Sequence, residues 1–460
     1  MSENRLSDYR VTDPYTGRVV QEFPTATDDE VRAAIERAHA AYEPWRSTPL
    51  AERAAILGRA ADAFASRSRE LAEIIRTEMG KPLGQGVFEA EFSGEIVQYY
   101  ADNAEAFLAD DVLQVRSGVD ARVRKSAQGV ILGIMPWNFP YYQVARFAFP
   151  NLMLGNTVLL KHAPQCPWSA TVIAEILAEA GLPAGAYENI FATNDQIGDI
   201  VIPDPRVRGV SLTGSERAGA AVAEIAGRHL KKVVLELGGS DPFIVLSTDD
   251  MDAVVEAAVE TRMENSGQSC NASKRFIVID DLYDAFSQKL AAAITALPVG
   301  DADDEDALVG PLSSQAAADR LREQTGAAVA EGAQVLAGTI TASGDARITP
   351  ALLGGVTDEM DAFREELFGP VGTVYRAKDV DDALRIANGT PFGLGARLWC
   401  TDPELAASVA DRIDAGMVSI NGAGSEDYDM PFGGTKRSGF GRELGPHGME
   451  EFMNKKLIVG

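Results

Sequence analysis

The first candidate for chemistry is a cysteine in a run of small polar residues. Cys270 ends the segment GQSC (267–270), which follows a helical pattern over 254–262. A reactive cysteine needs thiolate character and access to its reaction partner. Free cysteines are more often small buried hydrophobes, so an inert Cys270 remains open when the residue is taken alone.

The second candidate is a carboxylate at the end of an apolar run. Glu236 lies in LELGGSDP (235–242), and carboxylates are seldom buried unpaired. The two glycines that follow it permit a tight turn and the close approach of another chain or a ligand. A raised pKa there would suit a general base. The alternative is an acid paired with a cation at the strand end.

Three further segments could serve a negatively charged intermediate or a phosphate. In MPWNFP (135–140), Asn138 could direct its NH2 at a developing oxyanion, although a simple aromatic turn is the alternative. LTGSERAG (212–219) predicts a strand, a turn at Gly214 and Ser215, and a helix start. A helix N-terminus favours a phosphate, but the spacing is not GxGxxG and is weak evidence by itself. Lys161, at the end of another apolar run, is a second candidate cofactor contact.

The elements that must position these residues form an α/β pattern. Short apolar runs alternate with amphipathic stretches at 170–180 and 218–226, and the runs cover 130–135, 157–160, 189–192, 209–212 and 233–237. This predicts a doubly wound, Rossmann-like parallel sheet covered by helices on both faces. A similar alternation resumes near residue 240.

Outside these two regions the patterns are simpler. The first hundred residues are predicted to be helical, with Asp28 and Asp29 at the first N-cap. Residues 122–125 (RVRK) predict a strand or an exposed hairpin. The acidic cluster 300–306 lacks the residues of an EF-hand loop, so we expect a solvated loop.

Composition limits the class of protein. With 460 residues, two or three domains are expected, and the net charge of −26 disfavours nucleic acid and acidic membrane surfaces as partners. No apolar run approaches the roughly 20 residues that span a bilayer, and the N-terminus lacks a signal-peptide core, so we expect a cytoplasmic protein. The three cysteines form no CxxC pair and the four histidines no HExxH motif. Reduced thiols and a metal-free mechanism are therefore expected.

Taken together, the motifs resemble a known family. Residues 135–140, 236–239, 267–270, 365–371 (EELFGPV) and 431–443 (PFGGTKRSGFGRE) are similar to the successive signatures of the NAD(P)-dependent aldehyde dehydrogenase superfamily. They occur in the family's order along nearly the whole chain. The 34 residues from position 236 to position 270 also match the family's spacing.

The resemblance implies roles for individual residues. Cys270 would be the nucleophile that forms a thiohemiacetal and then a thioester, Glu236 the base that activates water, and Asn138 an oxyanion donor together with the backbone N–H of Cys270. Glu366 would contact a ribose of the cofactor and Phe368 the nicotinamide. The other cofactor contacts implied are Trp137, Lys161, Gly214 and Ser215.

The resemblance also implies the domain organisation. The aldehyde dehydrogenase fold would comprise an NAD(P)-binding domain (1–110 and 126–237), an α/β catalytic domain (238–438) and a small β oligomerisation element (111–125 and 439–460). A homodimer or homotetramer is expected.

The substrate and the choice of cofactor rest on finer detail. Within the family the chain is most similar to the shorter type of bacterial succinate-semialdehyde dehydrogenase, through LLKHAP (159–164) and LELGGSDPFIV (235–245). Arg146 matches an arginine that binds the far carboxylate of that substrate, and Asn421 matches a residue near the substrate pocket. For Arg146 the alternative is a salt bridge to an acid.

Departures from the pattern keep other substrates open. Glu264 stands where the longer type has a second arginine, and the loop 424–430 carries three acids. Glutarate semialdehyde or an uncharged aldehyde is therefore an alternative substrate. Pro164 stands where many NAD-selective relatives have a glutamate that would repel a 2′-phosphate, so NAD(P) is expected with a slight preference for NADP. A protonated His162 could assist, although a lone surface histidine is more often inert.

Other activities are disfavoured by single residues. CoA-acylating relatives usually lack the glutamate found at 236, and a non-catalytic member of the fold would be expected to lose Cys270. Ester cleavage through Cys270 is a plausible side activity.

Overall fold

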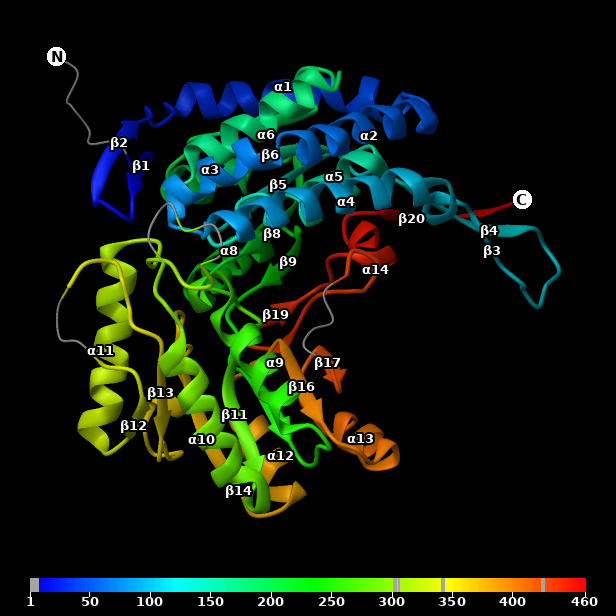
Figure 1. Cartoon of the computed structure of the whole chain (residues 1–460). Coiled ribbons are helices and arrows are strands. Elements are labelled where there is room, and N and C mark those ends of the chain that lie inside the picture. The colour runs from blue at the N-terminus through cyan, green and yellow to red at the C-terminus, as the bar shows by residue number, and fades with distance from the viewer. Residues whose placement is uncertain (1–7, 301–303, 305–306, 341–343, 423–426) are drawn as a thin grey trace.

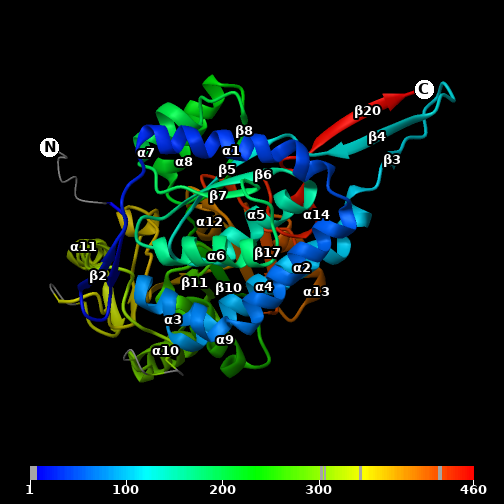
Figure 2. The same ribbon diagram turned by 90° about the horizontal axis from the view of Figure 1, so that it is seen from above.

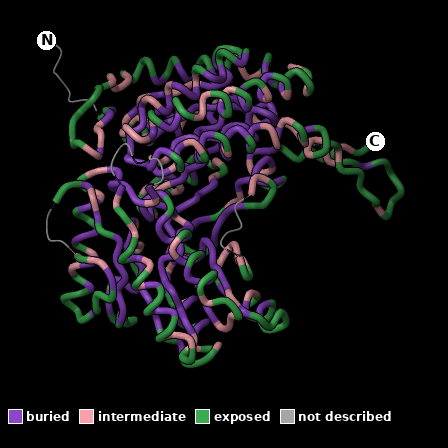
Figure 3. The backbone as a smooth tube through the Cα atoms, in the orientation of Figure 1, coloured by how far each residue is buried: buried purple, intermediate pink, exposed green. Residues whose placement is uncertain are grey.

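The computed structural model describes residues 8–300, 304, 307–340, 344–422 and 427–460. Two α/β units lie one above the other in Figure 1, and a small sheet projects from the upper unit. Figure 2 shows the same projection from above. Buried backbone runs through the strands of both units, whereas the projecting sheet is largely exposed (Figure 3). Within the described residues, no helix has the length and apolar character needed to cross a bilayer.

The N-terminal region begins with a hairpin that the helical prediction missed. Strands β1 (Arg10–Asp13) and β2 (Arg18–Glu22) pair antiparallel. The helices that follow are α1 (Asp28–Ser47), α2 (Leu50–Ser66), α3 (Ser68–Met79) and α4 (Leu83–Leu108). The N-cap of α1 is Thr27 and not Asp28 or Asp29, because Thr27 and Glu30 form a capping box.

The upper unit contains the predicted doubly wound sheet. Its strand order is β19-β9-β8-β5-β6-β7, and all neighbours are parallel except β19 with β9. The strands are β5 (Val130–Met135), β6 (Thr157–His162), β7 (Tyr187–Asn189), β8 (Val207–Thr213), β9 (Lys232–Glu236) and β19 (Gly439–Phe440). Each of the five predicted runs therefore coincides with or overlaps a strand.

Helices cover both faces of this sheet. They are α5 (Tyr142–Leu154), α6 (Pro167–Glu179), α7 (Asn194–Gln196), which continues as a π-helical turn (Ile197–Val201), and α8 (Glu216–Arg228). Alternate strand residues point to opposite faces. Ile131 packs in the core with α2, α4, α5 and α6, whereas Val130 and Leu132 pack with α1 and the 197–201 turn.

The lower unit is built on a seven-stranded sheet with the order β12-β13-β14-β11-β10-β16-β17, in which only β12 is antiparallel to its neighbour. Its strands are β10 (Asp241–Val245), β11 (Ser273–Ile279), β12 (Gln334–Ala337), β13 (Ala351–Gly354), β14 (Val371–Ala377), β16 (Gly395–Trp399) and β17 (Met417–Ile420). Its helices are α9 (Met251–Met263), α10 (Asp280–Ala296), α11 (Gln315–Glu331), α12 (Val380–Asn388) and α13 (Pro403–Ala410), with 3-10 turns at Glu264–Gly267 and Asp361–Phe363. Most of the acidic cluster 300–306 lies outside the described residues.

The C-terminal segment is shared between the upper unit and the projecting sheet. That sheet consists of β3 (Asp111–Val112), β4 (Ala121–Ser126) and β20 (Asn454–Val459). The strand predicted at 122–125 is therefore confirmed. However, β19 joins the upper sheet, α14 (Gly445–Glu450) contacts α5, and a short pair, β15 (Phe392–Gly393) with β18 (Thr435–Lys436), precedes them. Of segment 439–460, only β20 forms part of the projecting sheet.

The carboxyl ends of the parallel strands bring the predicted motifs together. β5 leads into the 135–140 turn, β8 into Gly214 and Ser215, and β9 ends at Glu236. Parallel strands place these ends at one edge of the sheet, where α/β folds bind ligands. Gly133 in β5 sets the distance to α5, because a Cβ atom there would lie 2.2 Å from a ring carbon of Phe147.

Gly133→Ala tests this packing. The added methyl must displace Phe147, so the free energy of unfolding should fall by about 1–3 kcal/mol, measured as a lower denaturant midpoint. Gly227→Ala is the matched control, because no neighbouring atom lies within 4 Å of its Cβ position on α8, and alanine favours a helix. Equal midpoints for the two variants would contradict the close packing of α5 on β5.

Candidate active site

Cys270 lies on a constrained loop between α9 and β11. Asn265, Ser266 and Gly267 adopt successive left-handed conformations with φ of 52°, 57° and 73°. Such conformations are costly for residues other than glycine and persist where the surroundings enforce them. Cys270 is partly exposed, whereas Cys166 and Cys400 are buried, and none of the three forms a disulfide. The accessible thiol is therefore the one that the sequence singled out.

The two glycines after Glu236 bring β9 against this loop. A Cβ atom at Gly239 would lie 2.3 Å from the carbonyl oxygen of Cys270, and one at Gly238 would lie 2.6 Å from Oε2 of Glu366. No side chain fits at either position without displacing these groups. The predicted close approach at this glycine pair is confirmed, and it places the candidate base, nucleophile and ribose ligand in one region.

Glu236 is a buried carboxylate. Its exposed fraction is 1%, and neither carboxylate oxygen has a hydrogen-bond partner among the described residues. Burial raises its pKa well above the usual value, and the positive charge of Arg146 opposes that rise. Burying a carboxylate without hydrogen-bond partners costs free energy of folding. Such groups are found mainly at functional sites. The raised pKa agrees with what a general base would require.

Asn138 connects the 135–140 turn to the nucleophile loop. Its side-chain Nδ2 donates to the backbone carbonyl oxygen of Gln268 at 3.1 Å. The backbone carbonyl oxygen of Asn138 accepts from Nδ2 of Asn265 at 2.8 Å. These bonds attach the side-chain amide of Asn138 to Gln268, which lies two residues before Cys270 in the sequence. The amide can therefore serve an oxyanion that forms beside the thiol.

The predicted cofactor residues also gather near the glycine pair. Oε1 of Glu366 accepts from the backbone N–H of Gly239 at 2.9 Å. The rings of Trp137 and Phe368 meet edge to face with centroids 5.7 Å apart. Because Trp137 belongs to the upper unit and Phe368 to the lower, this contact spans the two units.

Gly214 and Ser215 begin helix α8. The Ser215 hydroxyl caps the helix by accepting from the N–H of Ala218, as the predicted helix start requires. The N–H of Gly214 donates to the carbonyl of Glu236 at 2.9 Å. Gly214 therefore ties β8 to β9, and the N-terminus of α8 remains the element suited to a phosphate.

Lys161 and His162 end strand β6 and differ in what they offer an anion. Burial lowers the pKa of Lys161 to about 8. His162 is fully buried; its Nε2 bonds to the carbonyl of Pro140 at 3.0 Å and its Nδ1 accepts from the N–H of Ala163. Burial lowers the pKa of His162 to about 4. The structure therefore favours the inert alternative for His162, although the ring is buried and not on the surface, and both of its nitrogens have backbone partners.

Comparison with known proteins decides the family of the chain. The family model described as "Aldehyde dehydrogenase family" matches residues 1–458. The chain belongs to the aldehyde dehydrogenase family.

Individual members of that family are similar over the full length. Succinate-semialdehyde dehydrogenase (NADP+) of Deinococcus radiodurans is 49% identical over 453 residues, which cover 98% of this chain and 94% of that protein. Succinate-semialdehyde dehydrogenase (NADP+) 1 of Mycobacterium ulcerans is 43% identical over 451 residues, which cover 97% of this chain and 98% of that protein. The crystal structure of succinic semialdehyde dehydrogenase from Streptococcus pyogenes in complex with NADP+ is 40% identical, with a TM-score of 0.95 and coverage of 98% and 99%.

In this aldehyde dehydrogenase, Arg146 already has an anionic partner. It is fully buried on α5, and its Nε lies 2.5 Å from Oε2 of Glu443. The guanidinium also stacks over Phe432 at 4.3 Å and interacts electrostatically with Glu236 and Cys270. The salt bridge expected as the alternative is present. A role for Arg146 at the substrate carboxylate stays a prediction.

Asn421 is not brought together with the other predicted residues. Its side-chain amide accepts from the N–H of Cys400 and donates to the carbonyl of Cys400, both at 2.9 Å. The parallel strands β10, β11 and β16 begin at the Cys270 end of the sheet, and Asn421 follows the opposite end. Its observed role is to join the ends of β16 and β17, and its placement gives no support to a substrate contact.

Two residues of this region were not found from the sequence. Glu443 ends the predicted motif 431–443, and Lys274 follows Cys270 by four residues; both are buried. A signal for Lys274 existed, because two cations (Lys274 and Arg275) open the apolar run of β11, and buried cations are rare.

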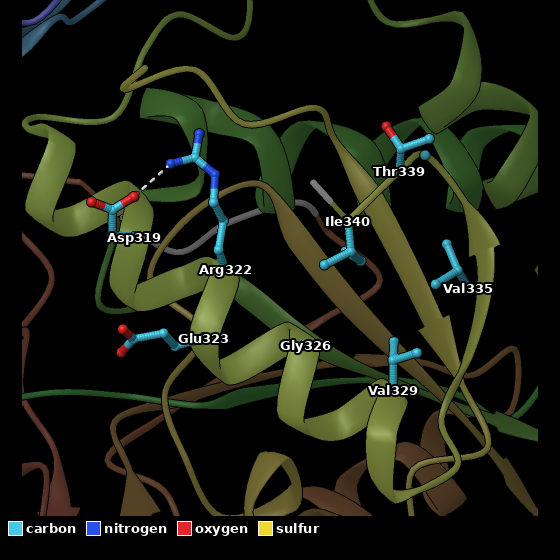
Figure 4. Close-up of a pocket in the computed structure, with 9 residues that line it drawn as sticks. Asp319, Arg322, Glu323, Gly326, Val329, Val335, Thr339 and Ile340 are labelled. Atoms are coloured by element: carbon cyan, nitrogen blue, oxygen red, sulfur yellow. Dashed lines mark hydrogen bonds and ion pairs between the residues drawn. The ribbon is translucent and has the colours of Figure 1, made fainter. Parts of the chain in front are cut away.

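A separate cavity of about 880 Å³ lies on the lower unit (Figure 4). None of the predicted site residues lines it; the lining consists of Asp319, Arg322, Glu323, Gly326, Val329, Val335, Gly338, Thr339 and Ile340, from α11 and the segment around β12. The cavity therefore takes no part in the chemistry at Cys270.

Arg146→Met should leave Glu443 buried without its cation. We expect a loss of about 3–5 kcal/mol in the free energy of unfolding, and the Arg146→Met/Glu443→Gln double variant should regain most of it. In that double variant, a tenfold fall in the kcat/KM ratio of succinate semialdehyde to butanal would identify Arg146 as a carboxylate ligand. An unchanged ratio would show that Arg146 does not bind the substrate carboxylate and serves only in the ion pair with Glu443. If the single variant is as stable as the wild type, the ion pair is not important for stability.

Proposed function

We propose that this enzyme oxidises succinate semialdehyde to succinate with NADP, through a thioester on Cys270. The observation that carries the chemistry is the packing of the loop that bears the accessible thiol of Cys270. The backbone carbonyl of Cys270 lies against Gly239 in the glycine pair that follows the buried carboxylate Glu236, and the amide of Asn138 bonds to the same loop. The proposed substrate and cofactor are supported by the names of the relatives from Deinococcus radiodurans and Mycobacterium ulcerans.

The first half of the reaction forms the covalent bond. The thiolate of Cys270 attacks the aldehyde carbon, and the oxygen becomes an oxyanion. The backbone N–H of Cys270 and the Nδ2 of Asn138 would donate to it, and one such donor is worth about 3–4 kcal/mol. Addition of the thiolate gives a tetrahedral thiohemiacetal with an electron-rich oxyanion. As its electron pair re-forms the C=O bond, the C–H bond breaks, the hydride leaves to the cofactor and a thioester remains.

The residues at the junction fit a dinucleotide. When bound, NADP accepts the hydride. Glu366, fixed by Gly239, would hold a ribose, while Phe368 and Trp137 would flank the nicotinamide. Ser215 presents the α8 N-terminus to a phosphate.

The 2′-phosphate would lie near the end of β6. Lys161 offers a cation there, and Pro164 supplies no acid to repel the phosphate. Because His162 is neutral and engaged, Lys161 carries the proposed charge contact alone among these residues.

The second half of the reaction hydrolyses the thioester. Glu236 would take a proton from water, which then attacks the acyl carbon and releases Cys270 as a thiolate. Because burial raises the pKa of Glu236, the carboxylate form that acts as a base is gained as the pH rises through that pKa. Deacylation should therefore accelerate with rising pH.

Arg146 is the proposed ligand of the far carboxylate of the substrate, a contact that a guanidinium makes bidentately. Its electrostatic interaction with Cys270 supports this role. The Glu443 ion pair requires the substrate to share the guanidinium with that acid.

The proposed assembly is a homodimer or homotetramer in the cytoplasm. The projecting sheet of β3, β4 and β20 exposes Val112, Leu457 and Val459. An isolated sheet with apolar exposed residues is poorly stable alone, so we propose that a second subunit covers it.

Glu236→Gln tests the proposed base. The amide keeps the shape but accepts no proton, so hydrolysis should slow by about a hundredfold or more. We expect a burst of NADPH equal to the enzyme concentration, a slow steady state, and loss of the rise of rate with pH. Cys270→Ala, as the control, should show neither burst nor turnover above a few per cent. A steady rate of Glu236→Gln within threefold of the wild type would reject Glu236 as the base.

The affinity for NADP should depend on pH through Lys161. Below pH 8 the ammonium can bind the 2′-phosphate; above it, the charge is progressively lost. The Kd for NADP should therefore rise from pH 7 to pH 9 more than that for NAD, measured by fluorescence titration. At pH 7, kcat/KM with NADP should at least equal that with NAD.

Lys161→Met should weaken NADP binding by about one to two decades and remove this pH dependence. Lys231→Met is the matched control, because burial also lowers the pKa of Lys231 to about 8, but Lys231 precedes the opposite, amino end of β9. A hundredfold preference for NAD in the wild type would contradict the cofactor assignment.

A further inference from the structure

Lys274 is a buried cation bonded to the backbone of the nucleophile. It lies in β11, four residues after Cys270, with an exposed fraction of 1%. Its Nζ donates to the carbonyl oxygens of Cys270 at 2.7 Å and Ser269 at 2.8 Å, and it lies 3.5 Å from Oε1 of Glu366. Two carbonyl oxygens thus accept protons of the ammonium group, and a carboxylate lies beside it as a counter-ion. Lys274 is therefore placed as a charged group.

The same carboxylate oxygen joins this contact to the glycine pair. Oε1 of Glu366 accepts from the N–H of Gly239, and Gly239 packs directly on the carbonyl of Cys270. The carbonyl of Cys270 is thus enclosed by Lys274 and Gly239, both of which contact Glu366. A shift of the Glu366 carboxylate would be felt at the nucleophile through both neighbours.

We propose that Lys274 is a positioning residue that couples the cofactor site to the reactivity of Cys270. Its ammonium fixes the carbonyl of Cys270 and favours the thiolate by its charge, while the carboxylate of Glu366 partly neutralises that charge. When the hydroxyls of a cofactor ribose donate hydrogen bonds to Glu366, its carboxylate neutralises less of the charge of Lys274. The effect of Lys274 on the thiol is then stronger. The coupling to the cofactor rests on the proposed role of Glu366 as a ribose ligand.

The charged groups around Lys274 give this coupling its direction. Besides Glu366, Lys274 interacts electrostatically with Asp241, Arg262 and Cys270. Burial lowers the pKa of Lys274, and Glu366 opposes that shift, so the carboxylate helps to keep the lysine charged. Arg262 donates to the carbonyl oxygens of Leu367 and Val371. Within the described residues, Lys274 is the cation that bonds to the carbonyl of Cys270 itself.

A second cation, Arg146, also interacts electrostatically with Cys270 and is paired with Glu443. Arg146 is present in every Lys274 variant, so a difference between Lys274 variants reports the lysine.

The test is the pH dependence of Cys270 alkylation by iodoacetamide in the full-length enzyme, with and without NADP+. The other two cysteines are buried, and Cys270→Ala gives the background. Lys274→Met should raise the pH midpoint of alkylation by about one unit, which slows the reaction at pH 7 about tenfold. The variant should also lose most of the change that NADP+ produces in the wild type.

Glu366→Gln should act in the opposite direction. At the acidic end of the profile, where Lys274 stays protonated even without Glu366, loss of the neutralising carboxylate should speed alkylation of the cofactor-free enzyme by about threefold, a shift of about half a pH unit. The comparison is made there because Glu366 also helps to keep Lys274 charged. Lys274→Arg keeps the charge and should restore the midpoint to within about half a unit. Lys289→Met is the matched control; that lysine is exposed, pairs with Asp252 on the surface of the lower unit, and should leave the profile unchanged.

An unchanged midpoint in folded Lys274→Met, or slower alkylation in Glu366→Gln, would overturn the proposal. If Lys274→Met does not fold, Glu366→Gln decides the proposal: faster alkylation of the cofactor-free enzyme supports it, and unchanged or slower alkylation overturns it. The assay needs no aldehyde and no turnover, so its outcome is independent of the Glu236→Gln burst. Failure of that burst would reject the proposed hydrolysis while leaving the alkylation result to stand on its own.

Discussion

The active site depends on a close approach between two loops that only glycine permits. A Cβ atom at position 239 would lie 2.3 Å from the carbonyl oxygen of Cys270. Strand β9 of the upper unit ends at Glu236, and the loop before β11 of the lower unit carries the thiol. A side chain at position 239 would force the carbonyl of Cys270, and with it the loop that carries the thiol, away from the segment that follows Glu236. Reactions between positioned groups are sensitive to displacements of about 1 Å.

Around this contact the structure concentrates charges that would be costly elsewhere. Glu236 has no hydrogen-bond partner among the described residues, whereas Arg146 and Glu443 neutralise one another. Three oxygen contacts offset the energetic cost of burying the charge of Lys274. Unsatisfied or perturbed ionisable groups cluster where a protein performs chemistry. Glu236 fits that pattern, and its paired neighbours supply the field that acts on it.

Local chemistry made much of this arrangement predictable. The strands around 130–135 and 233–237 follow from apolar runs bounded by turn residues, and the close approach at 238–239 follows from two consecutive glycines after a carboxylate. The N-terminal hairpin of β1 and β2 was missed because its strands are short and β2 is exposed, which leaves no apolar alternation to detect. Residues 439–460 were assigned as a whole to the oligomerisation element, because the pairing of β19 with β9 leaves no signal in the neighbouring sequence.

The sequence by itself therefore determined the doubly wound sheet, because periodicity acts over a few neighbouring positions. It identified Cys270 and Glu236 as nucleophile and base only through the ordered set of motifs that resembles the aldehyde dehydrogenases, since each residue taken alone left an inert alternative open. Only the tertiary structure decided how charges are paired. Arg146 meets Glu443 from a distant part of the chain, burial keeps His162 neutral, and Asn421 lies at the far end of its sheet. Burial and electrostatic partnership depend on which segments come within a few ångströms of one another, and that is set by the packing of the whole fold.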